Sequence, residues 1–352
     1  MDADVETFPK YVEPASNEVQ PRFAHGAGDS QNRQDLLRRF TATPYAVDLR
    51  LMQRTLRLET NNRSMVDLAL KYFERHQYGN STAPEFRWRV VTEPDSKTQS
   101  DGLPLSAFSE GGIRYVNIGQ RSFLAVDLEK REGIAFLAES FVEADARLRH
   151  RPPLDILFSM TASSLGLTPL SGGCVGTREK GVLVFGPPNS GKTTASYLAS
   201  KHGFEFHADQ VVFLDARGDN LRAWGDPFPA VFRPETLDFL PELRQTARQS
   251  TYGDLSFYYY DKSGMQSRWA SPVTPVCSVF LDRTGTGEPE LREFAAEEAI
   301  LRLQDCTLFE EGPKFYGQIL TALTAVVQSP VYHLRYASDP KIAAACIEKM
   351  LL

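Results

Sequence analysis

Hydrophobic and polar residues alternate in several short segments of the first half of the chain. Every second side chain is apolar there, which is the period of a half-buried strand. The segments are residues 47–51, 56–60, 86–91, 113–116 and 122–126. A helix is expected from Ser64, which would cap it together with Asp67 three residues later, and further helix is expected over residues 154–165. These elements predict a smaller α/β domain over residues 44–168.

After residue 168, the alternation of apolar and polar residues gives way to longer apolar runs separated by expected helices. Residues 181–185 form a continuous apolar run, as expected for a strand covered on both faces. A helix over residues 193–201 would end at Gly203. Further strands are expected at residues 204–207, 211–214, 276–281 and 331–336, and helices at 297–303, 313–327 and 339–351. This succession predicts a second α/β domain over residues 169–352.

The composition sets limits on the partners. The 352 residues suffice for two domains of about 100–200 residues each. Residues 1–43 are polar and proline-containing and predict a flexible tail. The net charge of −6 argues against a broad nucleic-acid surface. No apolar run reaches the about 18–20 residues of a membrane helix, and the N-terminus lacks the apolar core of a signal peptide. We therefore expect a cytoplasmic protein with neither a nucleic-acid nor a membrane partner.

The cysteines give no metal signature. Cys174, Cys277, Cys306 and Cys346 lie far apart and form no C-x-x-C pair. Such spacing favours reduced, partly buried thiols over a zinc site.

A glycine-rich loop carries the clearest chemical signal. Gly186, four further residues, Gly191, Lys192 and Thr193 match the spacing of a P-loop, or Walker A motif, between a buried strand and a helix. Glycines let successive backbone N–H groups converge on phosphate oxygens, and the helix N-terminus adds partial positive charge. Lys192 would contact the β- and γ-phosphates and the Thr193 hydroxyl would bind Mg²⁺. The motif predicts a site for a nucleoside triphosphate.

The residues expected to contact the nucleotide extend through the loop into the first turn of the helix. They are Gly186, Asn189, Ser190, Gly191, Lys192, Thr193 and Thr194. Pro187 and Pro188 carry no N–H group and cannot donate.

A triphosphate site also needs an acidic partner for Mg²⁺. Three residues qualify, because Asp209, Asp215 and Asp282 each lie at or near the end of an expected strand. Asp209 is favoured, since it follows the helix stop at Gly203 by six residues, where the next strand of a βαβ unit would lie. The spacing leaves Asp215 and Asp282 open, although each could simply cap the turn after its strand.

The loop, the segment around Asp209 and the chain end at residues 330–336 together resemble the HPr kinase/phosphorylase family over about residues 165–352. The resemblance implies a phosphoenolpyruvate-carboxykinase-like P-loop core that uses ATP and Mg²⁺ to phosphorylate a serine of a carrier protein, or another hydroxyl in its relatives. It gives Asp209 the role of accepting the hydroxyl proton. The family's second acid is here Gln210, and a histidine common before the P-loop strand is missing.

These observations leave two hypotheses of different classes. The first is a kinase that transfers the γ-phosphate of Mg-ATP to a hydroxyl of a protein, peptide or small molecule, with Lys192, Asp209 and Arg233 as catalytic residues and Thr193 and Asp209 as metal ligands. The second is a catalytically weak nucleotide-binding regulatory or assembly protein, favoured by Gln210 and the missing histidine. A switch-type or motor NTPase finds no support. The chain could also form a homo-oligomer.

Other residues have two interpretations each. Arg233, in the loop after the acidic strand, would face the transferred phosphate or form a surface ion pair. The aromatic stretch at residues 252–260 could be a lid over the substrate, although core packing is the more frequent role of such a stretch. Arg268 could assist phosphate binding, but a solvated position is favoured.

Overall fold

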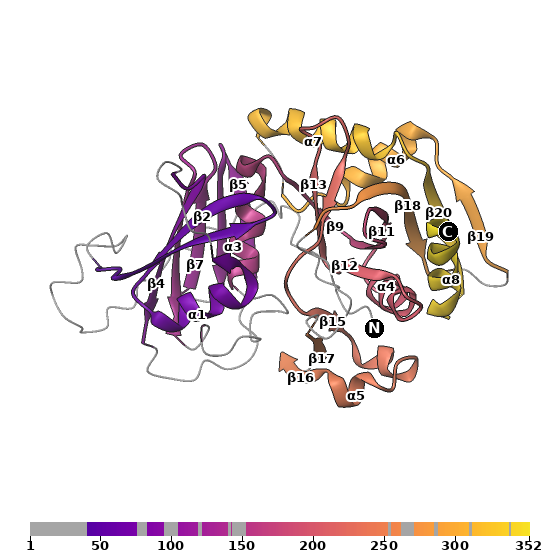
Figure 1. Cartoon of the computed structure of the whole chain (residues 1–352), viewed down its shortest axis with the longest axis horizontal. Helices are drawn as coiled ribbons and strands as arrows, with labels where there is room; N and C mark the ends of the chain where they lie inside the picture. The colour runs from indigo at the N-terminus through magenta and orange to yellow at the C-terminus, as the bar shows by residue number, and fades with distance from the viewer. Residues whose placement is uncertain are drawn as a thin grey trace, which may run out of the picture.

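The structure is a computed structural model that combines several β-sheets with helices in a mixed α/β fold (Figure 1). It describes residues 41–75, 83–94, 105–118, 122–139, 142, 153–252, 255–261, 271–284, 288–309, 312–337 and 339–352. Almost all of the expected tail at residues 1–43 lies outside the described residues.

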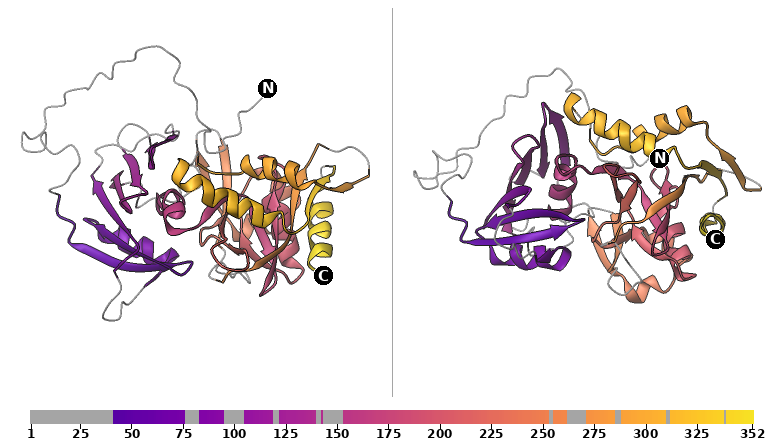
Figure 2. Two further views of the ribbon diagram at one scale, coloured as in Figure 1. Left: turned by 90° about the horizontal axis from the view of Figure 1, so that it is seen from above. Right: turned by 45° about the horizontal axis from the view of Figure 1, so that its top comes forward.

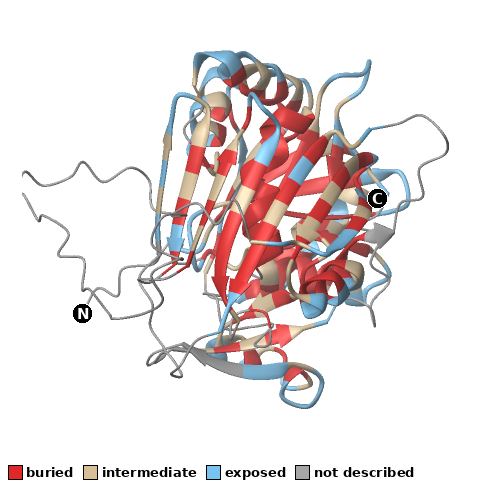
Figure 3. Ribbon diagram, turned by 90° about the vertical axis from the view of Figure 1, so that its left-hand side faces the viewer, coloured by how far each residue is buried: buried red, intermediate tan, exposed pale blue. Residues whose placement is uncertain are grey.

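The first half of the chain forms an eight-stranded sheet with the order β3-β1-β2-β4-β8-β7-β6-β5. The strands are β1 (Tyr45–Leu51), β2 (Arg54–Thr60), β3 (Glu74–Arg75), β4 (Phe86–Glu93), β5 (Leu105–Glu110), β6 (Ile113–Ile118), β7 (Ser122–Asp127) and β8 (Glu132–Ala138). β2, β4 and β8 pair in parallel and the other neighbours are antiparallel. Buried residues are concentrated along these strands (Figure 3). The five alternating segments are thus confirmed as strands.

Two helices pack on this sheet, α1 (Arg63–Tyr72) and α3 (Pro153–Thr161), the latter continued by the 3₁₀ helix η2 (Ala162–Leu165). The predicted cap at Ser64 is wrong. Asn62 is the N-cap, because its side-chain oxygen accepts a hydrogen bond from the backbone N–H of Ser64 at 2.8 Å. Asn62 performs the capping that the Ser64–Asp67 spacing suggested, two residues earlier.

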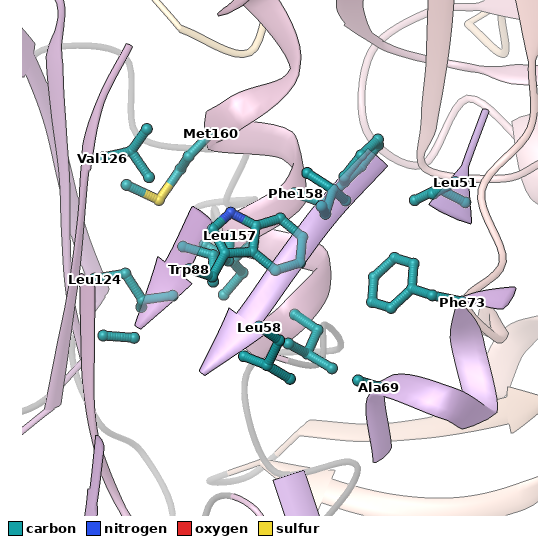
Figure 4. Close-up of a cluster of buried hydrophobic side chains, with 14 of the residues drawn as sticks. Leu51, Leu58, Ala69, Phe73, Trp88, Leu124, Val126, Leu157, Phe158 and Met160 are labelled. Carbon is teal, nitrogen blue, oxygen red and sulfur yellow. The ribbon is translucent and has the colours of Figure 1, made fainter. Parts of the chain in front are cut away.

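The core of this half combines aliphatic side chains with the aromatic rings of Phe73, Trp88 and Phe158 (Figure 4). Trp88 on β4 is 1% exposed, and its ring contacts those of Phe73 and Phe158 at centroid distances of 6.0 and 6.4 Å, while these two rings are 6.3 Å apart. Its indole N–H donates to the Thr161 hydroxyl at 3.2 Å, so the one polar group of the ring is satisfied.

The second half is built on a six-stranded sheet with the order β12-β10-β11-β18-β20-β19. The strands are β10 (Gly173–Gly176), β11 (Lys180–Phe185), β12 (Glu205–Ala208), β18 (Thr274–Asp282), β19 (Glu290–Glu293) and β20 (Val331–Arg335). β11, β18 and β20 are parallel neighbours, and β10 and β19 are antiparallel to the strands beside them. The ends of the three parallel strands therefore meet at one edge.

Helices cover both faces of this sheet. Val182 and Val184 share a core with α4 (Lys192–Lys201) and α8 (Pro340–Leu351). Leu183 and Phe185 point the other way, into a core with α6 (Ala296–Gln304) and α7 (Pro313–Val326). Burial on both faces explains why β11 reads as a continuous apolar run. The predicted helices and Gly203 as helix stop, with φ +98°, are confirmed.

Two small sheets complete the fold. One has the order β14-β13-β9, from β9 (Thr168–Ser171), β13 (Val211–Asp215) and β14 (Arg222–Trp224). The other has the order β15-β17-β16, from β15 (Ala230–Phe232), β16 (Arg248–Tyr252) and β17 (Leu255–Tyr260). Short helices η3 (Pro234–Asp238) and α5 (Leu243–Thr246) lie between β15 and β16.

One of the hydrophobic cores contains residues of both halves. All views show the two halves side by side (Figures 1 and 2). Phe213 on β13 packs against Phe158 at 5.1 Å between ring centroids, and Phe228 packs against Phe73 at 6.2 Å. The division of the chain at residues 168 and 169 stays a prediction. Among the described residues no helix is long and apolar enough to cross a membrane.

Arg54 on β2 links the halves by charge. Its side chain is 5% exposed. The Nε group donates to the carbonyl of Leu165 at 2.8 Å, and Nη2 forms an ion pair with Asp215 on β13. Arg217 also contacts Asp215, at 3.0 Å. Asp215 therefore neutralises a buried cation at the junction.

Replacing Arg54 by alanine should weaken this junction. Removing one partner of a buried ion pair costs about 3–5 kcal/mol, and because Asp215 keeps Arg217 we expect a loss of about 2–3 kcal/mol for Arg54→Ala. Urea-induced unfolding measures this change. The control Arg63→Ala removes an exposed ion pair with Asp67 and should cost less than about 1 kcal/mol. Equal losses in the two variants would contradict the role of Arg54.

Candidate functional site

The predicted phosphate loop lies where β11 meets α4. β11 ends at Phe185 and α4 begins at Lys192. Three residues between them have positive φ angles: Gly186 at +138°, Asn189 at +64° and Gly191 at +89°. Left-handed residues turn successive N–H groups toward one side of the chain and so build an anion-binding concavity. The local backbone therefore has the form that the motif requires.

The two glycines also allow close packing. A Cβ on Gly186 would lie 2.5 Å from the carbonyl oxygen of Leu281 on β18. A Cβ on Gly191 would lie 2.5 Å from the hydroxyl of Tyr336. Atoms cannot approach that closely, so a Cβ at position 186 would require a shift of the β18 backbone and a Cβ at position 191 a shift of the Tyr336 side chain.

Lys192 folds back over the loop. Its Nζ donates to the carbonyl of Gly186 at 2.7 Å and to that of Pro187 at 2.9 Å. An ammonium group has three donors, so the third N–H can meet an anion. Burial lowers the pKa of Lys192, while the charges that Cys306 and Asp209 carry when ionised oppose that shift. A bound anion would offset the cost of burying this cation.

The remaining loop residues differ in exposure. Asn189 is exposed, Thr193 is half-buried and Thr194 is buried. Ser190 is 2% exposed, and within the described residues its Oγ has no hydrogen-bond partner. Thr193 and Thr194 lie in the first turn of α4, where the N–H groups have no partner within the helix.

The three candidate acids, Asp209, Asp215 and Asp282, lie in different surroundings in the structure. Asp209, just after β12, is 2% exposed, and its charge acts on Lys192. Asp215 faces Arg54 and Arg217 at the junction of the halves. The carboxylate of Asp209 thus acts electrostatically on the lysine of the loop.

Asp282 ends β18 and has partners of its own. Its carboxylate accepts hydrogen bonds from the backbone and side chain of Thr284 and lies 3.5 Å from His333. The side-chain hydrogen bond from Thr284 contributes most to holding the pKa of Asp282 below its usual range. These contacts are those of a carboxylate that caps a turn.

The surroundings of Asp209 include a residue that sequence reasoning missed. Asp226 is 4% exposed, and its carboxylate accepts the backbone N–H groups of Asp209 at 3.2 Å and Phe228 at 3.1 Å. The side chain of Asp209 accepts the N–H of Val231 at 3.0 Å. Asp226 is 17 positions away in the sequence, so no local spacing could have indicated this contact.

Arg233 follows Val231 by two residues and occupies the N-cap position of η3, where its side chain makes no capping hydrogen bond. It is half-buried, and its guanidinium lies 5.9 Å from the centroid of Phe257. Phe257 and Tyr259 on β17 are 3% and 7% exposed, which favours core packing over a lid. Arg268 lies outside the described residues.

The donors near the loop fit Mg²⁺. Mg²⁺ bound with a nucleotide keeps several waters and needs only one or two protein oxygens besides the phosphates. Thr193 and Asp209 can supply a hydroxyl and a carboxylate. In the described part of the chain no three His, Cys, Asp or Glu side chains form a metal-binding group, which excludes an all-protein cage there but not a site completed by phosphates.

The thiols lie inside the protein or at its edge. All four cysteines are free, and Cys346 alone is half-buried rather than buried. Burial raises the pKa of Cys174 to about 12 and that of Cys277 to about 11. Neither of these two groups would be a nucleophile near neutral pH.

No family model and no curated protein sequence matches the chain. Among solved structures, the Hpr(Ser) kinase/phosphatase from Coxiella burnetii is similar over 52% of this chain and 92% of that chain, with 10% sequence identity and a TM-score of 0.27. A likeness at this TM-score carries no argument about family or activity. The resemblance of the motifs therefore remains a hypothesis.

A methyl group at position 186 should damage the loop. Gly186→Ala would place Cβ against Leu281 at a φ that strains an L-residue, so we expect a loss of about 1–3 kcal/mol in the free energy of unfolding. The control is Gly317→Ala in α7, where a Cβ meets nothing within 4 Å and should be neutral or stabilising by up to about 1 kcal/mol. An unchanged Gly186→Ala protein would show that the loop does not need this glycine.

Lys192 should make stability depend on pH. Because burial lowers the pKa of Lys192, the folded chain holds this proton less tightly than the unfolded chain, in which a lysine has its ordinary pKa of 10.5. Protonated Lys192 therefore costs stability at neutral pH, and the cost is relieved as the pH rises through the folded pKa toward 10.5. Urea unfolding should show the wild type gaining stability relative to Lys192→Met as the pH rises. A constant difference would contradict the burial of this charge.

Proposed function

We propose that the chain is an ATP-dependent kinase of the HPr-kinase-like type. Residues 169–352 would form a phosphoenolpyruvate-carboxykinase-like P-loop domain, and residues 44–168 a domain that selects the substrate or partner. The observation that carries the proposal is the loop at residues 186–193, whose positive φ angles and folded-back lysine suit a polyphosphate.

Phosphate binding follows from the backbone. The N–H groups of Asn189, Gly191, Lys192 and Thr193 are the available donors, whereas that of Ser190 donates to the carbonyl of Pro187 at 3.2 Å. The N-terminus of α4 adds partial positive charge. Lys192 supplies the full positive charge next to the β- and γ-phosphates. Because Lys192 already lies against Gly186 and Pro187, little of its rotational freedom is left to lose on binding.

Thr193 and Asp209 would hold Mg²⁺. When bound, this ion neutralises the negative charge that develops on the phosphate oxygens during transfer. Asp209 is suited to a second task, since the N–H of Val231 and the contact with Asp226 fix the carboxylate and its backbone. It would accept the proton of the acceptor hydroxyl as that oxygen bonds to the γ-phosphorus and the bond to ADP breaks.

Arg233 would complete the positive side of the site. It lies two residues after the N–H that binds Asp209, and its aromatic neighbour Phe257 limits its motion. A fixed guanidinium near the acceptor would neutralise charge on the transferred group. The acceptor would be a hydroxyl of a protein, peptide or small molecule, with serine as the first choice.

A second candidate is a nucleotide-binding regulatory or assembly protein with little turnover. The observation in its favour is Gln210, which stands beside Asp209 where the resembling family has a second acid. An amide cannot ionise and is a weak ligand for Mg²⁺. Asp226 is a buried carboxylate close to Asp209, but its two oxygens accept the backbone N–H groups of Asp209 and Phe228, so it does not replace the second acid.

Transfer of label from γ-labelled ATP distinguishes the kinase from the regulatory or assembly protein. The wild type, incubated with Mg²⁺ and a lysate from its own source, should label an acceptor. Lys192→Ala should lose nucleotide binding and transfer, whereas Asp209→Asn should keep binding measured without Mg²⁺ but lose about 10²–10⁴-fold in transfer rate. Asp282→Asn is the matched control, because it changes a neighbouring acid that is engaged by Thr284.

Each outcome has a clear meaning. Tight ATP binding without label transfer by the wild type would contradict the kinase hypothesis and favour a regulatory protein. Absence of ATP binding would contradict both hypotheses. Loss of transfer in Asp282→Asn with full transfer in Asp209→Asn would move the acidic role to Asp282.

A further inference from the structure

A buried tyrosine, Tyr336, contacts the phosphate loop from the interior of the protein. Tyr336 directly follows β20 and is 0% exposed. Its hydroxyl donates a hydrogen bond to the carbonyl oxygen of Ser190 at 2.6 Å, and its backbone N–H donates to the carbonyl of Asp282 at 2.9 Å. The side chain of Tyr336 thus connects the segment after β20 to the phosphate loop.

This hydrogen bond acts on the peptide between Ser190 and Gly191. In a planar trans peptide the C=O and N–H groups point in opposite directions. Fixing the Ser190 carbonyl toward Tyr336 therefore turns the N–H of Gly191 to the opposite side, away from the core. That N–H is one of the donors expected to meet phosphate.

The backbone alone does not fix this peptide. Gly191 has φ +89°, and glycine passes between conformations that other residues cannot adopt. The groups on either side are held by backbone hydrogen bonds, from the Ser190 N–H to Pro187 and from the Ala195 N–H to the carbonyl of Gly191, and Tyr336 adds a direct hydrogen bond to the peptide between them. Burial raises the pKa of Tyr336 to about 12, so the phenol keeps its proton and remains a donor near neutral pH.

We propose that Tyr336 is a positioning residue that holds the Ser190–Gly191 peptide with its N–H turned toward the phosphates. Its effect on the loop stands on the contacts given above, and its effect on nucleotide binding rests on the proposed function. The hydroxyl is pre-organising, because it sets the peptide before the nucleotide arrives. Removal of the hydroxyl should therefore increase the mobility of the loop even before a nucleotide binds.

Tyr336→Phe removes the hydroxyl and keeps the ring. Tyr332→Phe is the matched control, since it removes a hydroxyl from the same face of β20 that makes no hydrogen bond to the loop within the described residues. Amide hydrogen exchange without nucleotide should become about fivefold to tenfold faster at Ser190, whose N–H donates to the carbonyl of Pro187 at 3.2 Å, in Tyr336→Phe only. Amides of β11 and β18 serve as the internal reference for global unfolding.

The second readout is equilibrium binding of ATP. We expect Tyr336→Phe to bind about fivefold to tenfold more weakly, with a higher KM and a smaller change in kcat, and Tyr332→Phe to match the wild type. Unchanged exchange at Ser190, or faster exchange that extends equally to β11 and β18, would overturn the proposal. A wild type that does not bind ATP would sink the proposed function, while the exchange data would still decide the role of Tyr336.

Discussion

The close approach of neighbouring strands to the backbone at Gly186 and Gly191 is the constraint on which the candidate site depends. β18 reaches Gly186 through the carbonyl of Leu281, and the end of β20 reaches Gly191 through Tyr336. Because β11, β18 and β20 are parallel, their ends meet at one edge, where the loop must turn. The positive φ angles, the folded-back Lys192 and the start of α4 all follow from a backbone held in this way.

A shared core joins this site to the first half of the chain. Phe158 packs on Phe213 across the junction, and Arg54 is held by Leu165 and Asp215. Since side chains at the junction interdigitate, an acceptor bound by residues 44–168 would be held at a fixed position relative to the loop. This arrangement suits a protein that selects a substrate with one half and acts on it with the other.

The sequence predicted the elements whose pattern is periodic and the loop whose motif is local. Among the strands that it missed are β5, an edge strand whose side chains are largely half-buried or exposed, and β8, whose apolar run at its end hides the alternation. It also missed short strands of the second half, such as β9, β10 and β19, which are too short to show a period. Spacing left the acid open among three residues, because the choice depends on which strand end lies beside Lys192. Contacts of the loop with Tyr336 and of Asp209 with Asp226 join distant residues, and only the fold brings them together.

The central claim is that residues 186–193 bind the phosphates of a nucleotide. Calorimetric titration of the wild-type protein with ATP and with adenosine tests it directly. The account predicts that ATP binds at least about 100-fold more tightly than adenosine, since charge-assisted hydrogen bonds to phosphate contribute several kcal/mol together. Equal affinity for the two ligands, or no binding of ATP, would contradict it.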